Sequence, residues 1–162
     1  MIYIGVDPGK KGGFAIITHG ITGKQLVEVF PWDDKEFIHQ MRALAEDDYA
    51  REVGVIAAVE KVASMPHDSH KAAFNFGHSL GFIEGVLSGC WIGYQLVPPN
   101  VWKKSFSLIG KDKQASIEVC RNLFPDVDLK RTERCRTESD GKAEALLLCT
   151  YAMRHFGTGG AK

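Results

Sequence analysis

Four acidic side chains stand at the ends of apolar segments, where a carboxylate is costly to bury. Asp7 ends the run MIYIGV and Glu60 ends the run VIAAV, whereas Asp140 and Glu144 open an apolar helical run. A lone carboxylate at the rim of a core takes up a proton unless a partner or a cation stabilises its charge. The runs offer no matching buried Lys or Arg beside the acids, so the pattern predicts a divalent cation with oxygen ligands.

Each of these acids also has a purely structural explanation. Asp7 lies in Asp-Pro-Gly, which commonly forms a turn capped by the Asp, and Glu60 could simply begin an exposed loop. Asp140 and Glu144 lie four residues apart on one helix face, where acids near the N-terminus stabilise the helix dipole. Both explanations stay open, but repulsion between such close acids favours a shared cation.

Hydrophobic periodicity and the positions of Gly and Pro predict the elements that carry these acids. The first three strands are expected to pair antiparallel through short turns, one of them at 20–24, and later strands need crossovers through helices. We expect strands at 2–7, 13–19, 25–30, 53–60 and 91–97, and helices at 34–47, 71–89, 111–123 and 140–156. This order predicts an α/β fold with a mixed five-stranded sheet flanked by helices, in which strand ends collect catalytic groups.

The composition is that of a folded globular chain. Of the 162 residues, 44% are hydrophobic and 25% are charged, and this length suits one domain. We expect no membrane segment, because no stretch approaches the roughly 18 uninterrupted apolar residues of a membrane helix. No cysteine has CxxC or zinc-ligand spacing, so we expect ordinary thiols in a reducing, cytoplasmic compartment at Cys90, Cys120, Cys135 and Cys149.

The charges are balanced in number but not in position. Twenty basic and twenty acidic residues give a formal net charge of zero, which argues against strong non-specific binding to nucleic acid. Residues 28–60 nevertheless hold nine acids and three bases, whereas residues 102–136 hold nine bases and five acids. The second segment could therefore face phosphates, or it could be an ordinary solvated surface of mixed charge.

The densest basic group lies just after the predicted last strand. Four lysines beside Trp102 give a modest signal for nucleic-acid binding, namely Lys103, Lys104, Lys111 and Lys113, and Trp102 itself could equally be a core residue. In the helix expected at 71–89, glycines recur every four residues at Gly77, Gly81 and Gly85. That spacing is typical of close packing against another helix or subunit.

The motifs resemble those of the RuvC-like Holliday-junction resolvases of the ribonuclease H-like superfamily. The resemblance covers about residues 2–156 and rests on the order and spacing of several segments rather than on any one of them. These are IGVDPGKKGGFAI, VEK, FNFGHSLGFIEGVL, PPNVWKKSF with GKDKQAS, and DGKAEALLL. The tryptophan-lysine segment and the DGKAEALLL ending most resemble the branch found in phages, bacteria and chloroplasts.

The resemblance implies a nuclease domain at 1–156, and the glycine-rich tail GTGGAK at 157–162 is expected to be flexible. Family members keep one acid on the first strand, one on the fourth and a pair on the last helix, which correspond here to Asp7, Glu60, Asp140 and Glu144. These four acids would hold Mg²⁺ or Mn²⁺, with two ions per site. The better-known members have two Asp three residues apart in that helix, and the chloroplast branch has a histidine at the position of Asp140, so Asp140 departs from the common pattern.

The family also implies a substrate and a partner. We expect hydrolysis of a phosphodiester in four-way or other branched DNA by a homodimer, because symmetric cleavage of two strands requires two active sites. Lys103 and Lys113 correspond to lysines near the scissile phosphate. Three apolar side chains are candidates for wedges that unstack bases at the junction centre, namely Met65, Phe74 and Phe76.

Three other functions remain compatible with the sequence. Sugar kinases and actin-like ATPases share a related core, and DPGKKGG is similar to their phosphate-binding hairpin, but those proteins use two such domains and this chain has one such hairpin. A non-catalytic junction-binding protein would have no reason to keep four acids. A nuclease with the same chemistry could instead act on forks, flaps or RNA–DNA hybrids.

Overall fold

The computed structural model describes residues 1–20, 23, 25–61 and 69–157. Five strands form one sheet: β1 (Ile2–Asp7), β2 (Gly13–His19), β3 (Gln25–Pro31), β4 (Val55–Glu60) and β5 (Gly93–Val97). Six helices accompany them: α1 (Asp34–Glu46), α2 (Asp48–Val53), α3 (His70–Gly89), α4 (Pro99–Ser105), α5 (Lys113–Leu123) and α6 (Asp140–His155). Most of the turn expected at 20–24 and of the tail lies outside the described residues.

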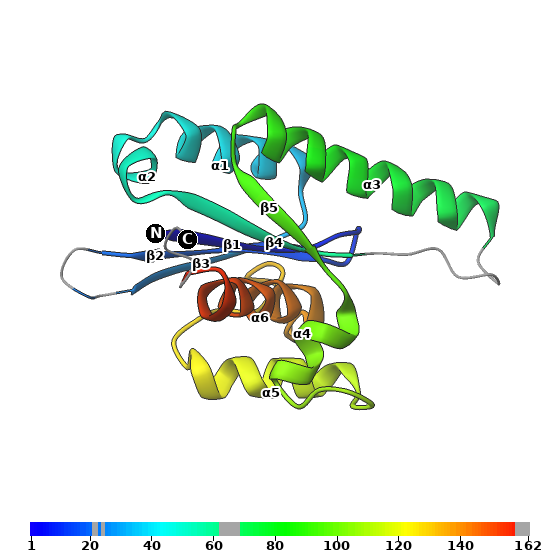
Figure 1. Cartoon of the computed structure of the whole chain (residues 1–162). Coiled ribbons are helices and arrows are strands. Elements are labelled where there is room, and N and C mark those ends of the chain that lie inside the picture. Colours follow the sequence, from blue (N-terminus) through cyan, green and yellow to red (C-terminus); the bar gives the residue numbers. More distant parts are fainter. Residues whose placement is uncertain (21–22, 24, 62–68, 158–162) are drawn as a thin grey trace.

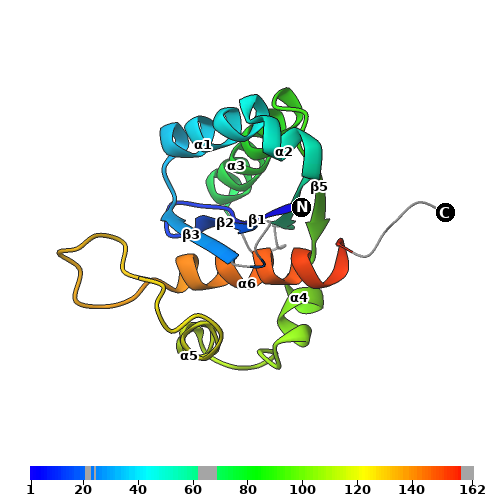
Figure 2. The same ribbon diagram turned by 90° about the vertical axis from the view of Figure 1, so that its left-hand side faces the viewer.

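The sheet is mixed, as the sequence predicts. Its strand order is β3-β2-β1-β4-β5. The pairs β1–β2 and β2–β3 are antiparallel, whereas β1–β4 and β4–β5 are parallel. Helices α1, α2 and α3 cover one face of the sheet, and α4, α5 and α6 lie on the other (Figures 1 and 2). Because β1 and β4 run parallel and are neighbours, their carboxyl ends meet at one edge of the sheet.

Alternation of side chains along β1 separates the two cores. Ile2, Ile4 and Val6 pack in the cluster on the α1 and α3 side, whereas Tyr3 packs in the cluster on the α6 side. A period of two therefore turns Asp7 toward α6. Glu60 on β4 follows the same rule, since it shares its face with Ala58, which belongs to the α6-side core.

Gly5 lets α6 lie unusually close to β1. A methyl group at this position would overlap the backbone of Ala145 and Cys149, both in α6. The thiol of Cys149 also donates a hydrogen bond to the carbonyl of Tyr3 at 3.1 Å. The apolar face of α6 is almost wholly buried, and this close seating brings its first turns over the carboxyl end of β1.

The structure corrects the sequence prediction at two places. Residues 48–53 form the short helix α2, and Gly54, at a φ of 82°, ends it, so the strand expected from residue 53 begins at Val55. Pro98 and Pro99 do stop β5, but Pro99 also opens α4, a helix that the sequence analysis does not predict. Proline is common at the first helical position, where its missing N–H costs nothing. Pro99 could therefore have been interpreted from the sequence as the start of a helix.

Strands β1 and β2 have the bounds expected from the sequence, and the other boundaries differ from those expected by at most two residues. Strand β5 begins two residues later, after Trp91 at a φ of 57°, and α5 begins at Lys113 after the N-cap Asp112. None of the helices in the described part of the chain is both long enough and apolar enough to cross a membrane.

We predict that Gly5→Ala lowers the free energy of unfolding by about 3 kcal/mol or more, because its methyl group would push α6 off β1. Gly93→Ala is the control, since nothing lies within 4 Å of an added methyl group there. Removing a glycine from a strand stabilises it by about 0.5–1 kcal/mol. Urea unfolding measures both changes, and equal midpoints for the two variants would contradict the close seating of α6.

Candidate active site

Three of the four predicted acids meet at one edge of the sheet. Asp7 ends β1, Glu60 ends β4, and Glu144 lies in the second turn of α6. One carboxylate oxygen from each lies within 4.8 Å of the other two. Glu60 is buried, and Asp7 and Glu144 are half-buried. The structure thus brings together three of the four acids that the sequence analysis names, and their role as metal ligands stays a prediction.

The cluster is electrostatically unfavourable without a cation. Burial, followed by the neighbouring charges of Glu60 and Glu144, raises the pKa of Asp7 to about 8. Burial also raises the pKa of Glu60, although the hydrogen bond from Trp102 opposes this shift. The site therefore favours binding of either a proton or a cation. Its potential metal ligands are all carboxylate oxygens, which Mg²⁺, Mn²⁺ and Ca²⁺ prefer.

Helix α4 contributes two side chains to this cluster. The buried indole of Trp102 donates from Nε1 to Oε1 of Glu60 at 3.0 Å. Its neighbour Lys103 places Nζ 3.2 Å from Oε1 of Glu144, and 5.1 Å from the centre of the Trp102 ring. Trp102 is thus both a core residue and a hydrogen-bond partner of Glu60. The ammonium group of Lys103 lies against the acid cluster.

Asp140 is held differently from the other acids. Its Oδ2 accepts from Nζ of Lys113 at 2.6 Å, and it is not among the three residues whose oxygens cluster. Partial burial acts to raise the pKa of Asp140, but the hydrogen bond and charge of Lys113 outweigh it and lower that pKa overall. The hydrogen bond and charge of Asp140 in turn raise the pKa of Lys113. Its role as a metal ligand stays a prediction.

Two lysines therefore lie beside the acids, although the apolar runs that carry the acids hold no such partner. Only the family resemblance placed Lys103 and Lys113 near the site. Lys103 and Lys113 come from α4 and the start of α5, so their proximity depends on helix packing that local sequence does not reveal. The buried Ser116 of α5 adds a further contact, since its hydroxyl lies 3.4 Å from Oε1 of Glu144. The site is thus a cluster of acids bordered on one side by hydrogen-bond donors from α4 and α5.

The other residues predicted to contact DNA are mostly exposed in the described part of the chain. Lys104 is exposed in the last turn of α4, and Lys111 is exposed two residues before α5. On α3, Phe74 and Phe76 are 72% and 39% exposed, as wedge residues would have to be. Met65 falls outside the described residues. Whether any of these side chains touches DNA stays a prediction.

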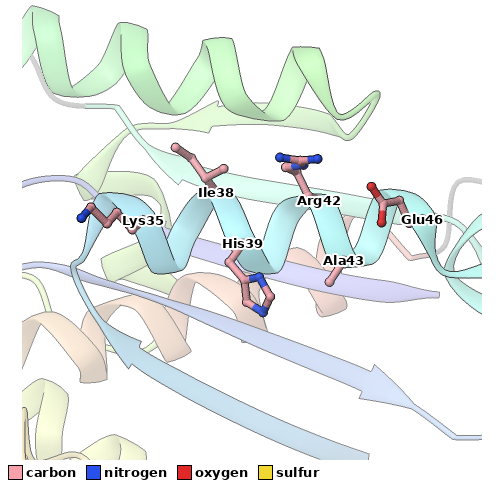
Figure 3. A pocket seen from close by; sticks show the side chains of 6 residues that line it. All are labelled: Lys35, Ile38, His39, Arg42, Ala43 and Glu46. Carbon is pink, nitrogen blue, oxygen red and sulfur yellow. The ribbon is translucent and has the colours of Figure 1, made fainter.

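A hollow along α1 shows no comparable chemistry. Its lining includes Lys35, His39, Arg42 and Glu46, which are spread along the helix and do not converge on one point (Figure 3). It lies on the opposite face of the sheet from α6. The acid cluster at the ends of β1 and β4 is therefore the better candidate for an active site.

Solved structures share this fold, although no protein-family model and no curated protein matches the sequence. RuvC of Thermus thermophilus has a TM-score of 0.56 at 18% identity, and the match covers 98% of each chain. The same protein in complex with a Holliday junction substrate has a TM-score of 0.60 at 17% identity, covering 100% of this chain and 99% of that one. The yeast mitochondrial Holliday junction resolvase has a TM-score of 0.50 at 10% identity, covering 93% and 77%.

At these identities the likeness establishes the fold. The chain has the ribonuclease H-like fold of RuvC, a mixed five-stranded sheet flanked by helices, as the sequence motifs implied. The match extends over nearly the whole chain, so the rim that carries Asp7, Glu60 and Glu144 is part of the shared architecture.

We predict that Trp102→Phe weakens Mn²⁺ binding by about 10–100-fold, the usual cost of losing a hydrogen-bond partner of a metal ligand. The ring keeps most of the packing but loses the N–H that holds Oε1 of Glu60. Calorimetric titration measures the affinity without any substrate. Trp91→Phe, at a side chain that is 96% exposed, is the control. Unchanged Mn²⁺ affinity in a folded Trp102→Phe variant would show that the hydrogen bond from Trp102 to Glu60 does not contribute to metal binding.

We predict that Asp7→Asn stabilises the protein in EDTA, and more at pH 8 than at pH 5. Folding raises the pKa of Asp7 from 3.8 to about 8, so the folded chain binds this proton more tightly and loses stability as pH rises between these values. The variant has no such titration. Thermal melting at both pH values measures the difference.

Glu46→Gln, at an exposed acid at the end of α1, is the control for losing one negative charge. In saturating Mn²⁺ at pH 8, the wild type is expected to melt at a higher temperature than Asp7→Asn. A bound cation stabilises the folded state, and only the wild type keeps all the ligands that bind it. A wild type that melts above Asp7→Asn in EDTA at pH 8 would contradict the electrostatic account.

Proposed function

We propose that this chain is a divalent-metal-dependent endonuclease that cuts branched DNA, with four-way (Holliday) junctions as its main substrate. The observation that carries the proposal is the cluster of Asp7, Glu60 and Glu144 at the strand ends of a RuvC-like fold. The neighbour of this fold that is solved with a Holliday junction substrate supports the choice of DNA.

Asp7, Glu60 and Glu144 would hold Mg²⁺ or Mn²⁺, with Asp140 completing a site for two ions. When bound, such ions supply an activated water and stabilise the charge that develops on the phosphate and on the leaving oxygen. The oxygen-only donor set and the raised pKa of Asp7 support this choice of cation. Glu60 is only 8% exposed, so its carboxylate forms the inner side of the cluster.

Two lysines would orient the substrate. In this structure Lys103 pairs with Glu144 and Lys113 pairs with Asp140, so both ammonium groups lie at the acids. A cation bound by the acids would weaken both pairs and free the ammonium groups for the scissile phosphate. Lys104 and Lys111 are exposed and would contact the DNA backbone, which positions the strand without reading its sequence.

The exposed face of α3 is proposed as the dimer contact. Methyl groups added at Gly77, Gly81 or Gly85 would meet nothing within 4 Å, so no described part of the chain packs on this stripe. A second copy of α3 could approach closely there, and the two active sites of such a dimer would cut two strands of one junction. Phe74, on the same helix, would unstack bases at its centre.

We predict that the wild type cuts a labelled four-way junction in Mg²⁺ faster than three-way, flap, duplex or RNA–DNA hybrid substrates. Asp7→Asn, Glu60→Gln and Glu144→Gln are expected to lower the cleavage rate by more than about 100-fold, because even outer partners of a metal site contribute about 10–100-fold. Asp140→Asn is expected to cost less, since Lys113 already engages that carboxylate.

The exposed Glu46→Gln variant is the matched control and should cut like the wild type. Tight junction binding with no cleavage in either Mg²⁺ or Mn²⁺ would favour a non-catalytic junction-binding protein. Fast cleavage by Asp7→Asn would overturn the mechanism. A preference for flaps or hybrids over junctions would keep the chemistry and change the substrate.

A further inference from the structure

A second hollow lies beside the acid cluster and is not used by the mechanism above. It has a volume of about 410 Å³ and lies between the β1–β2 hairpin and the loop that joins α5 to α6. That loop projects from the body of the molecule (Figure 2). Its lining includes Lys10, Lys11, Arg131, Cys135, Glu138 and Asp140.

The base of this loop is fixed to the core. Lys142 of α6 is only 6% exposed, and its Nζ donates to the carbonyl of Asp128 at 2.6 Å and to that of Lys130 at 2.9 Å. Lys130 and Glu138 form an isolated antiparallel bridge, and the N–H of Ser139 donates to the carbonyl of Leu129 at 2.9 Å. A buried lysine is costly unless it is hydrogen-bonded, so these bonds hold one defined loop shape.

The loop and the hairpin are also joined to each other. Nη2 of Arg131 donates to the carbonyl of Lys10 at 3.1 Å. The start of α6 touches the hairpin so closely that a methyl group at Gly141 would overlap the backbone of Lys11 and Gly12. Three segments that are distant in sequence therefore form the walls of the hollow, and they are connected by backbone contacts rather than by mobile side chains alone.

The charges in the hollow are predominantly positive. Its two acids are already neutralised from outside, since Glu138 pairs with Arg121 and Asp140 pairs with Lys113. Lys10 and Lys11 are exposed and form no ion pair with any described residue. Together with Arg131 they offer three cationic groups to an anion.

The hollow adjoins the candidate active site. The hairpin begins directly after Asp7, and a methyl group at Gly12 would lie 3.2 Å from Oδ2 of Asp7. Asp140 belongs to both regions, because it lines the hollow and lies one turn before Glu144 on α6. The hollow therefore lies next to the acids that would hold the reacting phosphate.

We infer that this hollow binds a backbone phosphate of the DNA strand next to the phosphate that is cut, through Lys10, Lys11 and Arg131. The inference rests on the proposed function and adds a subsite to it. These residues position the strand and do not act on the reacting atoms. Contacts to phosphate carry no base information, so the subsite adds affinity to every DNA sequence alike.

The salt dependence of DNA binding tests the subsite. Lys10→Gln/Lys11→Gln is expected to bind a four-way junction about 10–100-fold more weakly than the wild type at 0.1 M salt, measured in Ca²⁺ to prevent cleavage. Each lost phosphate contact lowers the slope of log affinity against log salt by about one. The expected decrease is therefore between one and two.

Lys35→Gln/Arg42→Gln is the matched control. It removes two positive charges from exposed positions along α1 (Figure 3). It therefore changes the net charge as much as Lys10→Gln/Lys11→Gln does, but it leaves Lys10, Lys11 and Arg131 in place. Its salt slope should equal that of the wild type. Arg131→Lys keeps the charge of the hollow, so it should keep most of the slope even though the bond to the carbonyl of Lys10 is altered.

Alkylation of Cys135 locates the DNA independently of affinity. This thiol lines the hollow, and hydrogen bonding to Thr132 lowers its pKa, which favours reaction with iodoacetamide. Bound junction DNA is expected to slow its alkylation at least about fivefold. Cys90 follows α3 at the far edge of the sheet and serves as the internal reference, read by mass spectrometry of the same sample.

The outcomes separate the subsite from the proposed function. An unchanged salt slope in Lys10→Gln/Lys11→Gln, or no protection of Cys135, while the wild type still cuts the junction, would overturn the subsite alone. A wild type that neither binds nor cuts any branched DNA would overturn both. A smaller slope in that variant and protected Cys135, with unprotected Cys90, would establish the subsite.

Discussion

The mutual repulsion of three carboxylates at one edge of the sheet is the constraint on which the rest of this structure depends. Asp7, Glu60 and Glu144 are drawn together by strand pairing and helix packing, and burial makes their charges harder to solvate. A fold that holds these acids so close has lower stability than one with neutral residues there, unless a cation offsets the repulsion. Stability and the proposed activity therefore place opposite demands on the same residues.

The rest of the fold holds the acids together with hydrogen-bond donors and close helix packing. The near-contact of α6 with β1 at Gly5 fixes the height of Glu144 above the sheet, and α4 supplies the indole of Trp102 to Glu60. These contacts restrict the carboxylates to a narrow set of positions, so little reorganisation is needed to bind a cation. The half-buried Lys103 pairs with Glu144 on the same side of the cluster.

Much of this arrangement could be predicted from the sequence, because local patterns specify strands and their ends. Asp7 and Glu60 were identified since each ends an apolar run, and the mixed sheet follows from the order of turns and crossovers. The partners of the acids could not be identified in the same way. The position of Trp102 against Glu60 depends on α4, and the burial of Lys142 depends on a loop that is distant from the sheet. Such contacts arise from tertiary packing, which side-chain type alone does not reveal.

The central claim is that the three clustered carboxylates form a divalent-cation site. The most direct test is a crystal structure of the protein in Mn²⁺, with the ion located by its anomalous scattering. We expect an anomalous peak bonded to oxygens of Asp7, Glu60 and Glu144, at about 2.0–2.3 Å, the range of metal–carboxylate bonds. Absence of a peak at this position, at a Mn²⁺ concentration that supports DNA cleavage, would contradict the account.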